Sequence, residues 1–195
     1  MKNKWLISLG AITSSFAAMP LLAAGCSQKG LKLIKNDENL KGKEVDDDSQ
    51  DDRKKAVYFS VTEEKIDLSK IKLSLIKPIE KDKLFTRKNV EGFTAYFQSF
   101  ENENQFQFKP DSSDKKVYQG EPFAKLLNIP DGYTITNVQK PVYVSGKGYK
   151  NASGFIKLTQ EGDGWKATFR LFRKGSKNVD PAVSTEVYEL FIPNK

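Results

Sequence analysis

The sequence predicts a mainly β domain of the α+β class, in which antiparallel hairpins form a sandwich-like sheet with about one short helix. Two observations predict this fold. From Ala56 onward, apolar and polar residues alternate in short runs, as they do in half-buried strands, and polar or glycine-containing turns separate these runs. The segment from Ala56 to Lys195 is 140 residues long, which is the size of one domain with a hydrophobic core.

The first half of this segment contains predicted strands and one predicted helix. The runs that alternate or flank a hairpin turn cover residues 57–61, 71–75, 93–100 and 105–109. The last two flank a polar four-residue connection, which predicts a hairpin. The run Glu121 to Leu127 predicts the helix, because Pro122 suits a first helical turn and Phe123, Leu126 and Leu127 then share one face.

The last third of the chain has the clearest strand pattern. Its predicted strands cover residues 133–138, 154–159, 165–172 and 183–192. Residues 145–153 are predicted to be a loop, and the glycine-containing run Glu161 to Gly164 predicts a tight turn. In the strand 165–172, every second residue is expected to face the core: Trp165, Ala167, Phe169 and Leu171.

The first 26 residues have the pattern of an export signal. Lys2 and Lys4 form a basic start, residues 5–22 are mostly apolar, and small residues precede Cys26. The run Leu22-Ala-Ala-Gly-Cys26 resembles the lipobox of bacterial lipoproteins, although leucine is commonest where Ala23 stands. The resemblance implies that residues 1–25 are removed and that Cys26 carries a diacylglyceryl group, including acyl chains such as palmitate. The alternative is an uncleaved spanning helix, since residues 5–25 are about as long as a bilayer requires.

Residues 27–55 are expected to be a disordered spacer between Cys26 and the domain. They contain eight basic and eight acidic residues and few strongly apolar ones. This composition predicts that the segment buries too little apolar surface to fold. A random coil of this length has a reach of about 30 Å. The acidic cluster Asp46 to Asp52 lacks the spacing of a calcium loop and is interpreted as part of this solvated spacer.

The lipobox and the spacer rich in lysine and asparagine resemble those of mycoplasma surface lipoproteins. The later strands also resemble the small β domain of the variable surface lipoproteins, over residues 130–193. The segments that carry this second resemblance are Tyr133-Thr-Ile, Gly154-Phe-Ile-Lys-Leu, Lys166-Ala-Thr-Phe-Arg-Leu-Phe, Lys174-Gly-Ser-Lys and Val187-Tyr-Glu-Leu-Phe. The resemblance implies display on the outer face of the cell membrane, a role in adhesion or as a surface antigen, and no catalytic residues.

The sequence lacks the residues that several common catalytic mechanisms require. The chain has no histidine, which excludes a Ser-His-Asp triad, and its one cysteine excludes an internal disulfide and a cysteine-ligated metal. Removing Lys2 and Lys4 lowers the net charge from +7 to +5, which is not typical of a dedicated nucleic-acid binder. The glycine-containing segment Ser145 to Lys150 lacks the spacing of a phosphate-binding loop. We therefore expect no catalytic residues, no metal and no cofactor.

One cluster of residues is a candidate binding face. Residues 147–177 contain eight basic residues and only Glu161 and Asp163 as acids. If strand 165–172 buries its odd-numbered residues, the even-numbered ones face outward beside the preceding strand. The candidate anion- or glycan-binding face is then Lys157, Lys166, Arg170 and Phe172. The alternative is a solvated face whose cations pair with Glu186 and Glu189.

Together, these patterns predict a monomeric, non-catalytic lipoprotein that is held at the cell membrane by Cys26 and faces the extracellular side. Its partners are expected to be the lipid bilayer and a host or anionic surface ligand. Two alternatives remain open: an accessory lipoprotein that binds substrates for uptake, and an exported metal-dependent hydrolase.

Overall fold

The computed structural model describes residues 30–47, 55–88, 91–99, 103–110 and 119–195. The predicted export signal, Cys26, most of the acidic cluster and the turn at 101–102 lie outside the described residues. The described residues form a mainly β fold, as predicted, with two single-turn 3-10 helices, η1 (Glu38–Leu40) and η2 (Lys81–Lys83). The strands are β1 (Lys32–Asn36), β2 (Val57–Phe59), β3 (Lys72–Leu75), β4 (Phe93–Gln98), β5 (Gln105–Gln107), β6 (Pro122–Leu127), β7 (Tyr133–Thr136), β8 (Val142–Val144), β9 (Lys150–Ala152), β10 (Phe155–Glu161), β11 (Gly164–Arg173) and β12 (Ala182–Pro193).

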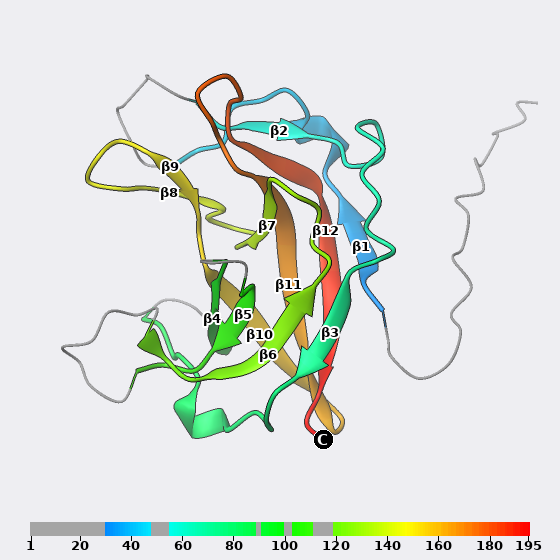
Figure 1. Cartoon of the computed structure of the whole chain (residues 1–195), viewed down its shortest axis with the longest axis vertical. Helices are drawn as coiled ribbons and strands as arrows, with labels where there is room; N and C mark the ends of the chain where they lie inside the picture. Colours follow the sequence, from blue (N-terminus) through cyan, green and yellow to red (C-terminus); the bar gives the residue numbers. More distant parts are fainter. Residues whose placement is uncertain (1–29, 48–54, 89–90, 100–102, 111–118) are drawn as a thin grey trace, which may run out of the picture.

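The long hairpin β11–β12 is the centre of the sheet (Figure 1). Each of its strands pairs with two further strands along its length. β11 pairs with β10 over residues 164–168 and with β7 over residues 170–173, and β12 pairs with β1 and β2 in the same way. The sheet therefore branches around this hairpin, and all of its pairings are antiparallel except the parallel pairing of β2 with β12.

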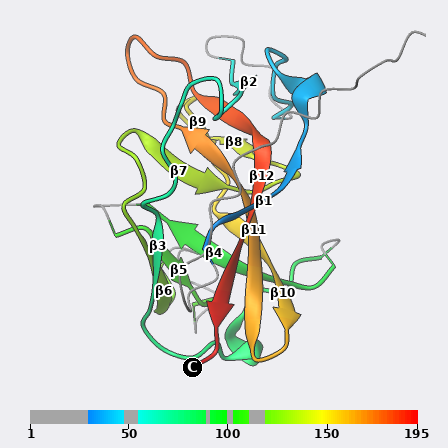
Figure 2. The ribbon, with the colours of Figure 1, turned by 90° about the vertical axis from the view of Figure 1, so that its right-hand side faces the viewer.

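The main sheet curls back on itself. Its path runs in the order β1-β12-β11-β10-β4-β5-β6-β3, and β3 at the far edge returns to contact β12. Figure 2 shows the same curled sheet from the side of β1. This curvature encloses a hydrophobic core between the two halves of the sheet, which is the sandwich-like arrangement that the sequence predicts.

The core confirms the predicted alternation in β11. Trp165, Ala167, Phe169 and Leu171 are all buried, and aromatic rings from β4, β5 and β6 fill the opposite side. The rings of Phe97 and Phe106 meet edge to face with their centroids 4.8 Å apart. A second, smaller cluster contains Val45, Ala56, Val142, Phe172 and Val183.

The predicted helix at residues 121–127 is wrong, because this run is strand β6. β6 pairs with both β3 and β5, and its register shifts by one residue, so that Gln107 lies opposite Pro122 while Phe106 lies opposite Ala124. Phe123 is the extra residue, and it is buried together with Leu126. The register shift thus gives a strand the three-residue spacing of buried side chains that is typical of a helix.

The prediction of a disordered spacer is wrong for residues 30–47. β1 lies along β12, and the backbone N–H of Asp37 donates to the carbonyl of Thr185 at 3.0 Å. Further on, Val45 is buried and its N–H donates to the carbonyl of Ala56 at 2.8 Å. The charged composition does not predict this strand, because β1 is held mainly by backbone hydrogen bonds. It lies at an edge of the sheet, where its lysine side chains remain solvated.

The predicted loop at residues 145–153 contains the end of a hairpin instead. β8 and β9 form a separate two-stranded sheet that projects from the body of the domain (Figure 1). The N–H of Ser145 donates to the carbonyl of Tyr149, and the N–H of Gly148 donates to the carbonyl of Ser145. The predicted hairpin between residues 93–100 and 105–109 is confirmed by the pairing of β4 with β5.

Candidate functional site

The predicted cationic face is only partly present. Lys157 lies opposite Thr168, so it shares a face of the sheet with Lys166 and Arg170, as their spacing predicts. Lys157 is exposed. Arg170 and Phe172 are only 3% and 2% exposed, so the prediction that they face solvent is wrong.

Lys166 forms ion pairs with Glu161 and Glu189. Its Nζ lies 3.0 Å from a carboxylate oxygen of Glu161 and 3.4 Å from one of Glu189. The hydrogen bond to Glu161, together with that to Glu189, raises the pKa of Lys166. This pairing agrees with the alternative interpretation of a solvated face, in which Glu189 balances a lysine.

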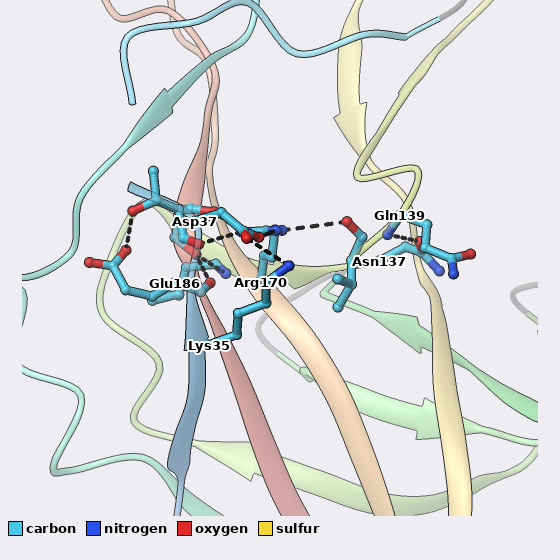
Figure 3. A network of polar contacts seen from close by, with 10 residues as sticks. Lys35, Asp37, Asn137, Gln139, Arg170 and Glu186 are labelled. Atoms are coloured by element: carbon cyan, nitrogen blue, oxygen red, sulfur yellow. Dashed lines mark hydrogen bonds and ion pairs between the residues drawn. The ribbon is translucent and has the colours of Figure 1, made fainter. Parts of the chain in front are cut away.

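Arg170 is the centre of a buried polar network (Figure 3). Its guanidinium donates to the carbonyl oxygens of Ser184 and Thr185 at 2.9 and 2.5 Å, and it forms an ion pair with Asp37. Burial by itself raises the pKa of Asp37, but the hydrogen bonds and positive charges of Lys35 and Arg170 outweigh it, so the pKa is lowered. The network ties the segment after β1 to the central hairpin.

Glu186 is a second buried charged residue next to this network, at 1% exposure. Its carboxylate accepts hydrogen bonds from the hydroxyl of Ser60 at 2.9 Å, the N–H of Val61 at 3.1 Å and the hydroxyl of Thr185 at 3.1 Å. Burial, and then the charge of Glu186, raise the pKa of Tyr188. Because these partners occupy Glu186, its role is to hold the loop after β2 against β12.

An open pocket of about 640 Å³ lies where β4, β7, β9 and the end of β11 meet. Aromatic, amide, hydroxyl and ammonium groups line it, among them Tyr96, Gln98, Thr134, Tyr143, Asn151 and Lys174. Within the described part of the chain, no carboxylate contributes to this lining. Aromatic faces combined with a few polar groups that can form hydrogen bonds are typical of binding pockets.

The β8–β9 hairpin forms one wall of this pocket and carries two exposed aromatic side chains. Tyr143 is 49% exposed and Tyr149 is 62% exposed. An ion pair joins Asp47 to Lys150, which lies at the loop end of the hairpin opposite Val144, and both side chains are buried. The ion pair therefore fixes the position of the projecting hairpin. The hairpin carries tyrosine rings on its surface, and the pocket lies beside it.

The sequence missed the pocket because its walls come from four separate stretches of chain. The one local signal is the glycine-containing segment Ser145 to Lys150, in which the exposed Tyr149 lies. In the structure, two backbone N–H groups of that segment, those of Ser145 and Gly148, close the hairpin rather than face a ligand.

A smaller pocket of about 460 Å³ lies beside η2 and is lined by residues that include Lys81, Asp82 and Phe93. Across the described ranges, no three acidic, histidine or cysteine side chains gather closely enough to hold a metal ion. No helix in the part of the chain that the structure describes is long and apolar enough to cross a membrane.

The fold and the pocket define a class: a mainly β domain with an open pocket beside a projecting hairpin. The chain belongs to the Mycoplasma P30 protein family, whose model matches residues 41–193. This membership supports the prediction of a mycoplasma surface protein. No curated protein and no solved structure matches the chain.

Proposed function

We propose that this chain is a non-catalytic binding domain displayed on the outer face of a mycoplasma cell membrane, where acylated Cys26 anchors it. The observation that carries the binding role is the pocket beside the β8–β9 hairpin. Its lining offers tyrosine rings, amides and Lys174, and no carboxylate among the described residues. Such a lining recognises a ligand by stacking and hydrogen bonds, whereas hydrolysis needs a positioned acid, base or metal.

We propose that the ligand is carried by a host or other cell surface. The protein would then act in adhesion or as a surface antigen. Membership of the Mycoplasma P30 protein family supports a surface role. The more specific likeness to variable surface lipoproteins, over residues 130–193, is part of this proposal. We also propose that the domain works as a monomer, without a cofactor.

The proposed anchor is the lipobox run that ends at Cys26. A diacylglyceryl group has two acyl chains, and two chains make membrane attachment durable where one chain gives only reversible binding. The anchor predicts that the mature protein partitions into the membrane without a spanning helix.

The first experiment compares the wild-type protein with Cys26→Ser in cells. We expect the wild type to begin at a diacylated Cys26 by mass spectrometry, to partition into detergent and to be cleaved by protease added outside the cells. We expect the variant to keep its leader and to carry no lipid. A wild-type protein that keeps Met1 and lacks lipid contradicts the anchor, and one that resists external protease in intact cells contradicts surface display.

A second candidate function, the binding of substrates for uptake, is favoured by the same pocket volume of about 640 Å³. The two functions differ in their ligands. A small solute that raises the melting temperature of the purified domain supports uptake, and binding only to intact host surfaces supports adhesion.

A further inference from the structure

We infer that strand β1 lies against the lipid surface, so that one side of the domain rests on the membrane and the pocket beside the β8–β9 hairpin faces away from it. This inference rests on the proposed anchor at Cys26. It identifies an interaction surface, the exposed run Lys32 to Lys35, and its partner, the headgroup region of the bilayer that holds the acyl chains.

The chain between the anchor and the sheet is short. Gly30, where the described chain begins, is four residues after Cys26, and β1 begins at Lys32. A fully extended chain advances at most about 3.5 Å per residue, so Gly30 lies within about 14 Å of Cys26 and Lys32 within about 21 Å. A spacer of 29 residues would have lifted the domain well clear of the lipid, but this length does not.

The side chains of β1 suit an interface between lipid and water. All four residues from Lys32 to Lys35 are exposed. Leu33 is 40% and Ile34 is 44% exposed, and a register shift between Leu33 and Lys35 interrupts the alternation of the strand. Two neighbouring apolar side chains flanked by lysines match the pattern in which apolar groups enter the headgroup boundary and ammonium groups stay hydrated.

The charge around β1 favours an anionic lipid surface. The mature chain contains Lys29, Lys32 and Lys35 before its first acid, Asp37. Lys32 makes no ion pair within the described ranges, and the Lys35 side chain is 66% exposed although it lies 2.7 Å from Asp37. Lysines this close to a bilayer are attracted by negatively charged headgroups.

The backbone of β1 limits how deeply the strand enters. Among the described strands, β1 is an edge of the main sheet, so one row of its N–H and C=O groups is not paired with another of these strands. Water and headgroups satisfy such groups, but the hydrocarbon interior does not. β1 is therefore placed on the membrane and not in it.

This contact would orient the whole domain. In Figure 1, β1 and the β8–β9 hairpin lie on opposite sides of the central hairpin, and in Figure 2, viewed from the side of β1, the β8–β9 hairpin lies behind. With β1 on the lipid, Tyr149 and the pocket point outward, toward another surface.

The experiment uses the full lipidated protein and the fact that Cys26 is its only cysteine. Once Cys26 is acylated, a cysteine introduced by Ile34→Cys is the one free thiol and accepts a fluorescent label. Tyr149→Cys, at an exposed position on the projecting hairpin, is the control. The labelled proteins are reconstituted in phosphatidylcholine vesicles, with and without phosphatidylglycerol, that contain lipids carrying a quencher.

We expect the label at position 34 to be quenched several-fold more strongly than the label at position 149. Lys32→Glu should weaken the quenching at position 34 in vesicles with phosphatidylglycerol, and Lys177→Glu, at an exposed loop site, should not. Equal quenching at positions 34 and 149 on a protein with lipid at Cys26 overturns the docking of β1 alone. A mass spectrum without lipid at Cys26 overturns the anchor, and the docking of β1 with it.

Discussion

Gly154 leaves no room for a side chain in the wall of the pocket. A Cβ built at this position lies 2.6 Å from the carbonyl oxygen of Phe97 and 2.7 Å from a ring carbon of Tyr96. We expect Gly154→Ala to lower the free energy of unfolding by about 1–3 kcal/mol, the usual cost of overpacking, because a backbone atom is one of the two close neighbours. Urea unfolding of the purified domain measures this change.

Gly146 is the matched control for this substitution. It lies in the loop between β8 and β9, and a Cβ there meets nothing within 4 Å. Gly146→Ala should leave the free energy of unfolding unchanged or raise it slightly. Equal effects of the two substitutions would show that the pocket wall around Gly154 is not tightly packed.

The ion pair between Asp37 and Arg170 should make stability depend on pH. Because the pKa of Asp37 is lower in the folded protein than its ordinary value of 3.8, its contribution is complete above that value and is lost as the pH falls through the lower folded pKa. We expect Asp37→Asn to cost about 2 kcal/mol at neutral pH, because the charge is lost but an amide oxygen can still accept a hydrogen bond from Arg170. The difference from wild type should narrow below pH 3.8 in denaturant titrations.

Lys35→Gln is the control for the ion pair, since it removes the more exposed partner and leaves Arg170 bonded to Asp37. An exposed pair contributes about 0–1 kcal/mol, so this variant should unfold almost as the wild type does. A constant difference between Asp37→Asn and wild type from neutral pH down to well below the ordinary pKa of an aspartate would argue against the ionised pair.

Arg170 shows that the alternation of residues predicts the face of a strand on which a side chain lies, but not whether that face is exposed. The pattern of β11 correctly places Arg170 on the face opposite Trp165 and Phe169. It does not reveal that this face is covered at one end, because the cover comes from Asp37, 133 residues earlier. Distant cover of this kind leaves no trace in a short sequence window.

At the scale of elements, β1 and the segment up to Val45 are part of the domain. They contribute strand pairing with β12, the carboxylate of Asp37 and a side chain of the smaller core cluster. The family match also begins before the predicted domain boundary at Ala56, at residue 41. The domain is therefore longer than its alternating segment.

A chain that starts at Ala56 should be much less stable than one that starts at Gly30. The shorter chain exposes the edge of β12, loses the burial of Val45 and leaves the buried charge of Arg170 without its carboxylate. Removing one partner of a buried ion pair costs about 3–5 kcal/mol, so we expect a loss at least this large. Thermal unfolding by circular dichroism compares the two chains, and equal midpoints would contradict a structural role for residues 30–47.

At the scale of the whole molecule, the sequence predicted the local pairings and missed the distant ones. The β4–β5 and β10–β11 hairpins follow from alternation and turn residues, which act within a few positions. The parallel pairing of β2 with β12 and the pairing of β4 with β10 join strands far apart in the chain, and no short motif specifies them. The pocket was missed for the same reason, because it exists only after those pairings form.

The position of β12 in the chain has a consequence for how the protein is made. β12 (Ala182–Pro193) comes after all the other described strands in the chain, yet it pairs with β1, β2 and β11. Until β12 has been made, β1 and β2 lack the strand with which they pair, so a nascent chain cannot complete the sheet. If the chain is exported, as we propose, late closure of the sheet keeps the polypeptide able to pass through a translocation channel until β12 has been synthesised.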